Sequence, residues 1–221
     1  MKLKVIITGS TGMVGEGVLH ECLLHPDVEA VHVINRRPCK ILHPKLTEIL
    51  YGDFFNFTSI ENKLAGFDAC FFCLGVSSVG MKEEKYYHIT YDITMALASV
   101  LARINPGMVF CYVSGVGTDS TEKGRSMWAR VKGKTENKLM ELFPGRAFMF
   151  RPGYIQPTKG LKNTYKIYRI LGFTYPLWKL IFPRYVTTLR NVGLAMINTV
   201  TRGYEKQVLE CQDINKLANI K

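Results

Sequence analysis

The fold of this chain is decided by the stretch Val5-Ile6-Ile7-Thr8-Gly9-Ser10-Thr11-Gly12-Met13-Val14-Gly15. A run of β-branched residues leads into glycines that recur at positions 9, 12 and 15. Glycine accepts positive φ and has no Cβ, so the backbone can turn sharply and approach an anion closely. A helix that begins near Gly12 would direct its free N–H groups at a pyrophosphate. The pattern predicts a strand, a phosphate-binding turn and a helix, with an ordinary strand–helix turn as the alternative.

Strand and helix patterns alternate along the 221 residues. Helical spacing of apolar residues recurs over residues 14–22, 89–101 and 128–142, and each segment stops at a nearby proline. Apolar runs typical of buried strands cover residues 3–8, 30–35, 47–51, 69–74, 108–114, 147–150 and 207–211. This alternation predicts a single α/β domain over residues 1–221, of Rossmann type, with a doubly wound and mainly parallel sheet.

Composition narrows the class of protein. Hydrophobic residues make up 47% and charged residues 21% of the chain, as in a globular domain. The formal net charge of +11 would attract phosphates, nucleic acids or anionic membranes. Because the basic residues form no single block, we expect a solvated surface around the site of a polyanionic cofactor and no specific nucleic acid. Binding of nucleic acid or membrane stays open as an alternative, and such binding should collapse in salt.

The cysteines and histidines favour a cytoplasmic protein without a metal site. Six cysteines lack the spacing of a disulfide framework, so we expect them to be reduced. Cys70 and Cys73 form a C-x-x-C motif inside an expected strand, where an i, i+3 pair points to opposite faces. The five histidines show no ligand spacing. No apolar run is long enough to span a bilayer, and an expected strand beginning near Leu3 leaves no room for a leader.

Residues 158–190 interrupt the alternation. They mix aromatic and basic residues, with Gly172, Pro176 and Pro183 breaking any long helix. An irregular insertion after the sixth strand of such a sheet lies near the ligand-binding edge. We therefore expect a small C-terminal substrate region that acts as a lid. An interfacial membrane element or a packed helical hairpin are the alternatives.

Several short motifs in order resemble an extended or atypical short-chain dehydrogenase/reductase. The nearest branch is that of NAD(P)-binding, epimerase-like proteins related to the Tat-interacting oxidoreductase-like tumour suppressor. The resemblance covers nearly the whole chain. Its motifs are Thr-Gly-Ser-Thr-Gly-Met-Val-Gly at 8–15, Asn-Arg-Arg at 35–37, Gly-Asp-Phe at 52–54, Cys-Leu-Gly at 73–75, Tyr-Val-Ser-Gly-Val-Gly at 112–117, Lys-Gly at 132–133 with Glu136, and Arg-Pro-Gly at 151–153.

The second expected strand ends at Asn35, where an NAD-preferring site would place an acid against the ribose 2′-hydroxyl. The chain offers Arg36 and Arg37 there, and guanidinium groups suit a 2′-phosphate. We therefore expect NADP(H) in preference to NAD(H). A solvated basic turn is the alternative.

The resemblance implies a set of residues around the cofactor. Asp53 would face the adenine amino group, although an Asp in a tight turn could equally cap its own backbone. Small residues after the fourth strand would lie beside the nicotinamide ribose. The expected cofactor-binding residues are Gly9, Thr11, Gly12, Met13, Val14, Gly15, Asn35, Arg36, Arg37, Asp53, Leu74, Gly75, Val76 and Lys132.

The chemistry of the family needs a hydroxyl to polarise a carbonyl, a tyrosine to transfer a proton, and a lysine four residues later. Ser114 matches the hydroxyl position and Lys132 the lysine. Trp128 stands in the tyrosine position, and indole is only an N–H donor. Tyr154 is the first candidate to replace it. For the remaining hydroxyl groups we expect packing or surface roles; these are Tyr86, Tyr87, Tyr91 and Ser126.

The sequence thus predicts an NADP(H)-binding, epimerase-like oxidoreductase whose substrate is unknown. Trp128 keeps a second hypothesis open, a non-catalytic binding or regulatory module that responds to NADP(H). A small-molecule substrate, a protein partner and a homo-oligomer are all compatible with the pattern.

Overall fold

A computed structural model describes residues 2–163 and 180–220 of the chain. Its centre is a parallel sheet of seven strands in the order β3-β2-β1-β4-β5-β6-β9. The order reverses between β1 and β4, which is where doubly wound sheets bind their ligands. The strands are β1 (Leu3–Thr8), β2 (Val28–Asn35), β3 (Leu46–Leu50), β4 (Ala69–Phe72), β5 (Val109–Val113), β6 (Ala147–Arg151) and β9 (Val208–Glu210).

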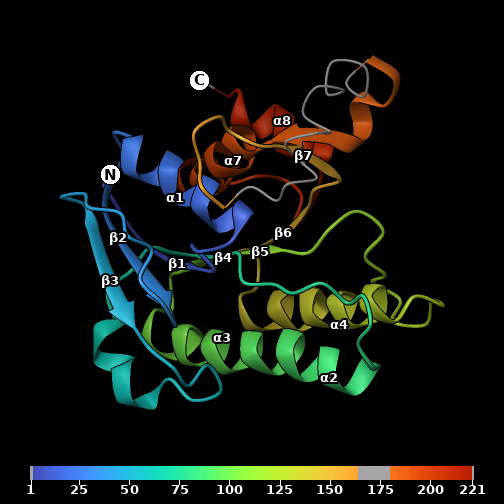
Figure 1. The fold of residues 1–221 in the computed structure, drawn as a ribbon, viewed down its shortest axis with the longest axis horizontal. Coiled ribbons are helices and arrows are strands. Elements are labelled where there is room, and N and C mark those ends of the chain that lie inside the picture. Colours follow the sequence, from blue (N-terminus) through green and yellow to red (C-terminus); the bar gives the residue numbers. More distant parts are fainter. Residues whose placement is uncertain (1, 164–179, 221) are drawn as a thin grey trace.

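Helices cover both faces of the sheet, so the fold has three layers (Figure 1). One face carries α1 (Met13–Leu24), α7 (Leu189–Arg202) and α8 (Cys211–Ala218). The other face carries α2 (Glu83–Tyr87), α3 (Ile93–Ile104) and α4 (Met127–Leu142), with a π-helical turn at His88–Asp92 joining α2 to α3. Within the described residues, 3₁₀ turns lie at Thr58–Lys63 and Pro183–Tyr185.

The sheet separates two hydrophobic cores, and the alternation along β1 shows why. Leu3, Val5 and Ile7 face the core under α1 and α7, whereas Ile6 faces the core under α3 and α4. Every residue of β4 is buried, because both faces of this central strand are covered. The predicted α/β fold is confirmed, and each expected strand exists with its ends shifted by at most two residues.

The two cysteines of the C-x-x-C motif lie on opposite sides of the sheet. Cys70 belongs to the core under α3 and α4, and Cys73 packs against the core under α1. Both thiols are free, and burial raises the pKa of each above its ordinary value. A thiol held protonated is a poor nucleophile and metal ligand, so this pair contributes packing.

A small second sheet pairs β7 (Tyr154–Gln156) with β8 (Val186–Thr188) in parallel, which the sequence analysis did not predict. The expected irregular insertion at 158–190 therefore ends earlier than predicted, since residues 186–190 form β8 and the start of α7. The side chain of Thr188 caps α7 by accepting a hydrogen bond from the Asn191 N–H. Most of the expected lid, residues 164–179, lies outside the described residues.

Within the described part of the chain, no helix combines the length and apolar character needed to cross a bilayer.

Candidate cofactor-binding site

The glycine turn joins β1 to α1 at the carboxyl edge of the sheet. Gly9 has φ of +72°, and a Cβ there would lie 2.7 Å from the backbone of Cys73 after β4. A Cβ on Gly15 would lie 2.2 Å from the Gly9 carbonyl oxygen, so only glycine lets α1 pack onto the turn. Gly12 precedes the first helical residue, and its N–H donates to the Gly9 carbonyl. The free N–H groups of the first turn of α1 therefore lie beside the end of β1, as pyrophosphate binding requires.

Asn35 ties the end of β2 to its surroundings. Its Oδ1 accepts a hydrogen bond of 2.9 Å from the Ser10 hydroxyl, and its Nδ2 donates to Glu48 on β3 at 2.9 Å. Glu48 also accepts the Cys39 N–H at 2.8 Å, and these hydrogen bonds hold its pKa below the ordinary value against the opposing effect of burial. The buried side chain of Asn35 thus fixes the position of the loop that follows, which carries Arg36 and Arg37.

A cleft of about 890 Å³ opens beside this loop. Its walls come from Gly9 and Thr11, one side of α1, residues 34–41, Phe54, Leu74 and residues 160–163. Arg36 and Arg37 are exposed in it, and within the described residues neither guanidinium forms an ion pair. Two unpaired cations beside the glycine turn make this part of the cleft suitable for an anion.

The cleft contains only part of the expected cofactor set. Six of the expected residues line it, namely Gly9, Thr11, Asn35, Arg36, Arg37 and Leu74. Asp53 accepts the Phe55 N–H at 3.0 Å, so its carboxylate caps its own turn, and it is Phe54 that lines the cleft. The roles expected for Asp53, Gly75 and Val76 stay predictions.

The lining residues that were not among the expected cofactor-binding residues include one acidic and two basic side chains, Glu16, Lys40 and Lys162. Glu16 lies on the first turns of α1, and Lys162 follows β7. The expected insertion at 158–190 includes Lys162 and was expected near the ligand-binding edge, but its contact with Glu16 on α1 has no signal in the local sequence. The position of Lys40, three residues after Arg37, was a signal that could have been used.

Ser114 and Lys132 come together at the end of β5. The Lys132 Nζ donates to the carbonyl oxygens of Ser114 at 2.7 Å and Val113 at 3.2 Å, and lies 5.6 Å from the ring centre of Tyr112. Burial lowers the pKa of Lys132 to about 8, although the negative charge of Glu136 opposes this shift. The Ser114 hydroxyl donates to the Phe150 carbonyl at 3.1 Å. The Lys132 side chain thus contacts the main chain of Ser114, and the catalytic and cofactor-binding roles expected for the two residues stay predictions.

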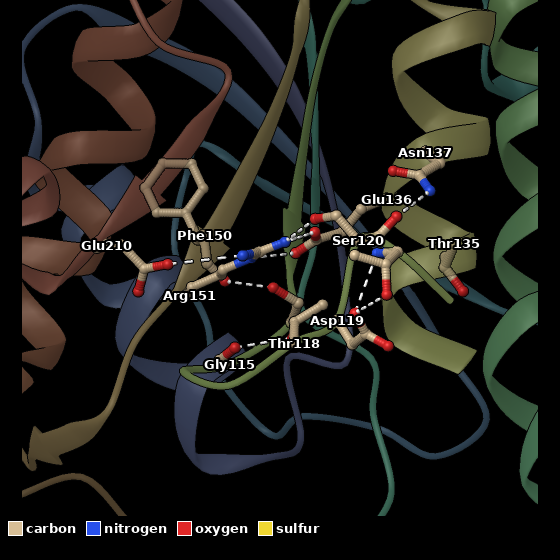
Figure 2. Close-up of polar contacts among 12 residues, drawn as sticks. Gly115, Thr118, Asp119, Ser120, Thr135, Glu136, Asn137, Phe150, Arg151 and Glu210 are labelled. Carbon is tan, nitrogen blue, oxygen red and sulfur yellow. Dashed lines mark hydrogen bonds and ion pairs between the residues drawn. The ribbon is translucent and has the colours of Figure 1, made fainter. Parts of the chain in front are cut away.

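Glu136 lies one helical turn after Lys132 and is fully buried. Arg151, at the end of β6, donates to both of its carboxylate oxygens, including Nε to Oε1 at 3.0 Å, and also to the Ser120 hydroxyl at 2.6 Å (Figure 2). A more distant contact of 3.6 Å joins Arg151 to Glu210. These contacts raise the pKa of Arg151 against the opposing effect of its burial, so the guanidinium stays charged in this cluster.

Close packing of the 115–126 loop on α4 explains the glycine in the Lys-Gly pair at 132–133. A Cβ on Gly133 would lie 1.8 Å from the carbonyl oxygen of Asp119, so glycine lets the 115–126 loop rest on α4. The Asp119 N–H donates to the Ala129 carbonyl, which ties this loop to the first turn of the helix.

Trp128 lies in that first turn, and its ring reaches Gly117, where a Cβ would be 3.7 Å from the indole Cη2. It is half-buried, and its ring packs against the 115–126 loop. Tyr154 lies on β7, and its hydroxyl donates to Gln156 Oε1 at 3.2 Å. Tyr86 is buried, and Tyr87 stacks on Tyr91 at 4.7 Å between ring centres. Which group transfers a proton stays a prediction.

The family model of the NAD dependent epimerase/dehydratase family matches residues 5–125, which include the glycine turn and Ser114. The chain belongs to this family. Members bind a nicotinamide cofactor, and the expectation of an epimerase-like short-chain dehydrogenase/reductase is thereby confirmed.

Solved structures share the fold. The enzyme WbmF of Bordetella bronchiseptica, solved with NAD+, has a TM-score of 0.67 at 14% identity, over 99% of this chain and 78% of its own. A UDP-N-acetylglucosamine 4-epimerase from Methanobrevibacter ruminantium M1 has a TM-score of 0.66 at 14% identity, over 98% of this chain and 81% of its own. These similarities support the three-layer fold of this NAD dependent epimerase/dehydratase family member.

Two fungal relatives are more similar in sequence. The protein named fmp52-1, mitochondrial, of Aspergillus terreus is 28% identical over 70% of this chain and 68% of its own length. The protein of the same name from Aspergillus oryzae is 28% identical over 67% of this chain and 64% of its own length.

Proposed function

We propose that this family member is an NADP(H)-dependent, epimerase-like oxidoreductase of the atypical short-chain type. The observation that carries the proposal is the pair Arg36 and Arg37, exposed in the cleft where an NAD-selective site would hold an acid. A guanidinium donates several N–H groups in a planar fork that suits phosphate oxygens. The glycine turn beside this pair supports binding of the pyrophosphate.

Lys132 is proposed to hold the cofactor ribose. An ammonium group has three donors. Two of them go to the carbonyl oxygens of Val113 and Ser114, which leaves one for a ribose hydroxyl. Gly75 and Val76, both exposed after β4, are proposed to lie beside the same ribose. When bound, the cofactor supplies or takes a hydride.

Ser114 is proposed to orient the substrate. Its hydroxyl proton is directed at the Phe150 carbonyl, so the O–H group must turn about the Cβ–Oγ bond to donate to a substrate carbonyl. Trp128 cannot move a proton through its indole N–H at neutral pH, so this chain lacks the usual acid one turn before Lys132. We therefore expect slow chemistry on a site that binds cofactor well, with Tyr154 as the first replacement acid.

Calorimetric titration of the chain with NADPH and with NADH tests the proposal. A charge-assisted hydrogen bond to the 2′-phosphate contributes roughly 1.5–3 kcal/mol, so NADPH should bind about ten-fold more tightly or better. Equal or tighter binding of NADH contradicts the preference for NADP(H).

A turnover assay with aldehydes, ketones and quinones tests the catalytic part separately. Slow oxidation of NADPH with at least one carbonyl class is the expected result. Tight NADPH binding with no turnover on any class would instead support the non-catalytic binding module.

The single domain over residues 1–221 and the cytoplasmic location are also part of the proposal. The fungal relatives carry the word mitochondrial in their names. Fractionation of cells that express the untagged chain decides between the two compartments.

A further inference from the structure

Glu16 makes an unusual connection between distant parts of the chain. It lies on the first turns of α1, and the residue is only 5% exposed. Its Oε1 accepts the backbone N–H of Lys162 at 2.9 Å, and its Oε2 accepts that of Asn163 at 2.7 Å. A carboxylate is costly to bury unless its oxygens are hydrogen-bonded, and two charge-assisted bonds meet that need here. The phosphate-binding helix therefore holds the segment that follows β7 in place.

This connection gives the cofactor cleft a second basic wall. Residues 160–163 line the same cleft as Arg36 and Arg37. Among the described residues, four cationic side chains line it and none of them forms an ion pair with another described residue; they belong to Arg36, Arg37, Lys40 and Lys162. Glu16 is the carboxylate among the lining residues, and both of its oxygens are engaged by N–H donors. The charge exposed in the cleft is therefore positive on more than one side.

A phosphate monoester carries about −1.5 to −2 charges near neutral pH, more than a single cation balances. Arg36 and Arg37 approach the cleft from the end of β2. The Lys162 backbone is fixed by Glu16, while its side chain is exposed and flexible enough to follow a bound anion.

We propose that Lys162 is a direct ligand of the cofactor 2′-phosphate, and that Glu16 is the positioning residue that brings Lys162 to the site. This inference rests on the proposed NADP(H) preference and adds to it a residue from the opposite half of the chain.

The first test compares Lys162→Ala with Lys159→Ala by titration of each variant with NADPH and NADH. Lys159 is exposed in the same segment but does not line the cleft, which makes it a matched control. Lys162→Ala should weaken NADPH binding about ten-fold and leave NADH binding unchanged, since only NADPH carries the extra phosphate. Lys159→Ala should change neither.

The second test is a double-variant cycle with Glu16→Gln, because an amide offers one acceptor where the carboxylate offers two. Glu16→Gln should weaken NADPH selectively, and Lys162→Ala should then cost little more in that background. Asn163→Pro removes the N–H donor to Glu16 Oε2 and should act in the same direction. Circular dichroism and a thermal unfolding curve show whether each variant is folded. If Glu16→Gln does not fold, Lys162→Ala still tests the proposal, because Lys162 is exposed.

The outcomes separate the two proposals. If wild type does not prefer NADPH, the proposed function fails and the inference fails with it. If wild type prefers NADPH but Lys162→Ala behaves like Lys159→Ala, only the inference is overturned. Equal losses for NADPH and NADH also overturn it, because Lys162 would then act on a part of the cofactor that both share. A ratio of NADPH to NADH affinity that falls only in the Lys162 and Glu16 variants supports it.

Discussion

The cleft beside the glycine turn and the cluster of Glu136, Arg151 and Glu210 both contain several charged side chains, but they use charge in opposite ways. In the cleft, Arg36 and Arg37 are exposed and form no ion pair among the described residues. In the cluster, Arg151 is bound to a fully buried Glu136 (Figure 2). Buried charges must be paired to offset their desolvation, so they are committed to the fold. Exposed charges at the edge of a cleft remain available for a ligand. The difference separates the cations that are available to a ligand from those that stabilise the fold.

Trp128→Tyr tests whether the region around Lys132 lacks only a proton-transfer group. A positioned general acid is worth about 10²–10⁴ in rate, so the variant should reduce a carbonyl substrate faster by a factor approaching that range. Initial rates of NADPH oxidation measure it. Trp128→Phe is the matched control, because it also removes the indole but adds no hydroxyl.

Both substitutions shrink a packed side chain and can cost stability, which a thermal unfolding curve reports. Fast turnover by wild type that Trp128→Tyr leaves unchanged or impairs would contradict the prediction. Another group, with Tyr154 first, would then supply the proton.

Arg151→Ala tests whether the buried pair is structural. Removing the guanidinium leaves Glu136 buried without its partner, and such losses are about 3–5 kcal/mol in the free energy of unfolding. Urea denaturation followed by circular dichroism measures it. Arg103→Ala removes an exposed ion pair to Glu61 and should cost far less. Similar losses for the two variants would show that the Glu136 pair is not stabilising the fold.

Arg36→Ala and Arg37→Ala test whether the exposed cations of the cleft bind the cofactor and leave the stability of the fold unaffected. Each should weaken NADPH about ten-fold, leave NADH unchanged and leave the urea midpoint unchanged, because neither guanidinium is paired within the described residues. Calorimetry and denaturation of the same samples measure both effects. A loss of stability without a change in the NADPH to NADH ratio would assign these arginines to the fold.

The pH dependence of NADPH binding tests whether Lys132, which lies one helical turn before Glu136, also contacts the cofactor. Its pKa of about 8 is lower than usual, so the cation is present below that pH and is lost as the pH rises through it. NADPH affinity should therefore fall between pH 7 and pH 9, by less than about ten-fold because one proton is involved. Titrations at several pH values measure the fall.

Lys132→Arg is the control, since an arginine stays charged and should remove the pH dependence. Glu136→Gln should move the fall to lower pH, because it removes the negative charge that opposes the lowering of the Lys132 pKa. A flat profile for wild type between pH 7 and pH 9 would remove Lys132 from cofactor binding.

Residues that act through their immediate neighbours could be predicted from the sequence. Gly9 and Gly15 were predicted from the turn that they form, and Arg36 and Arg37 from their position after a buried strand. Ser114 and Lys132 were assigned to the serine and lysine positions through the family resemblance, and the structure brings the Lys132 ammonium to the Ser114 carbonyl oxygen. Asp53 could not be assigned in this way, because the carboxylate of an Asp in a turn can bind either a ligand or its own backbone. In the structure it accepts a hydrogen bond from the Phe55 N–H.

The sequence by itself determined the seven strands of the main sheet, the helices α1, α3 and α4 between them, the glycine turn and the basic end of β2. These features depend on periodicity, glycine conformation and charge over short stretches, which are visible without a fold. Only the tertiary structure decided that Glu16 binds the backbone after β7, and that Glu136 binds Arg151. Each of these contacts joins residues from different elements, and a buried carboxylate takes whichever donors the packing brings within reach. That packing depends on the whole core, so no single segment of the sequence predicts it.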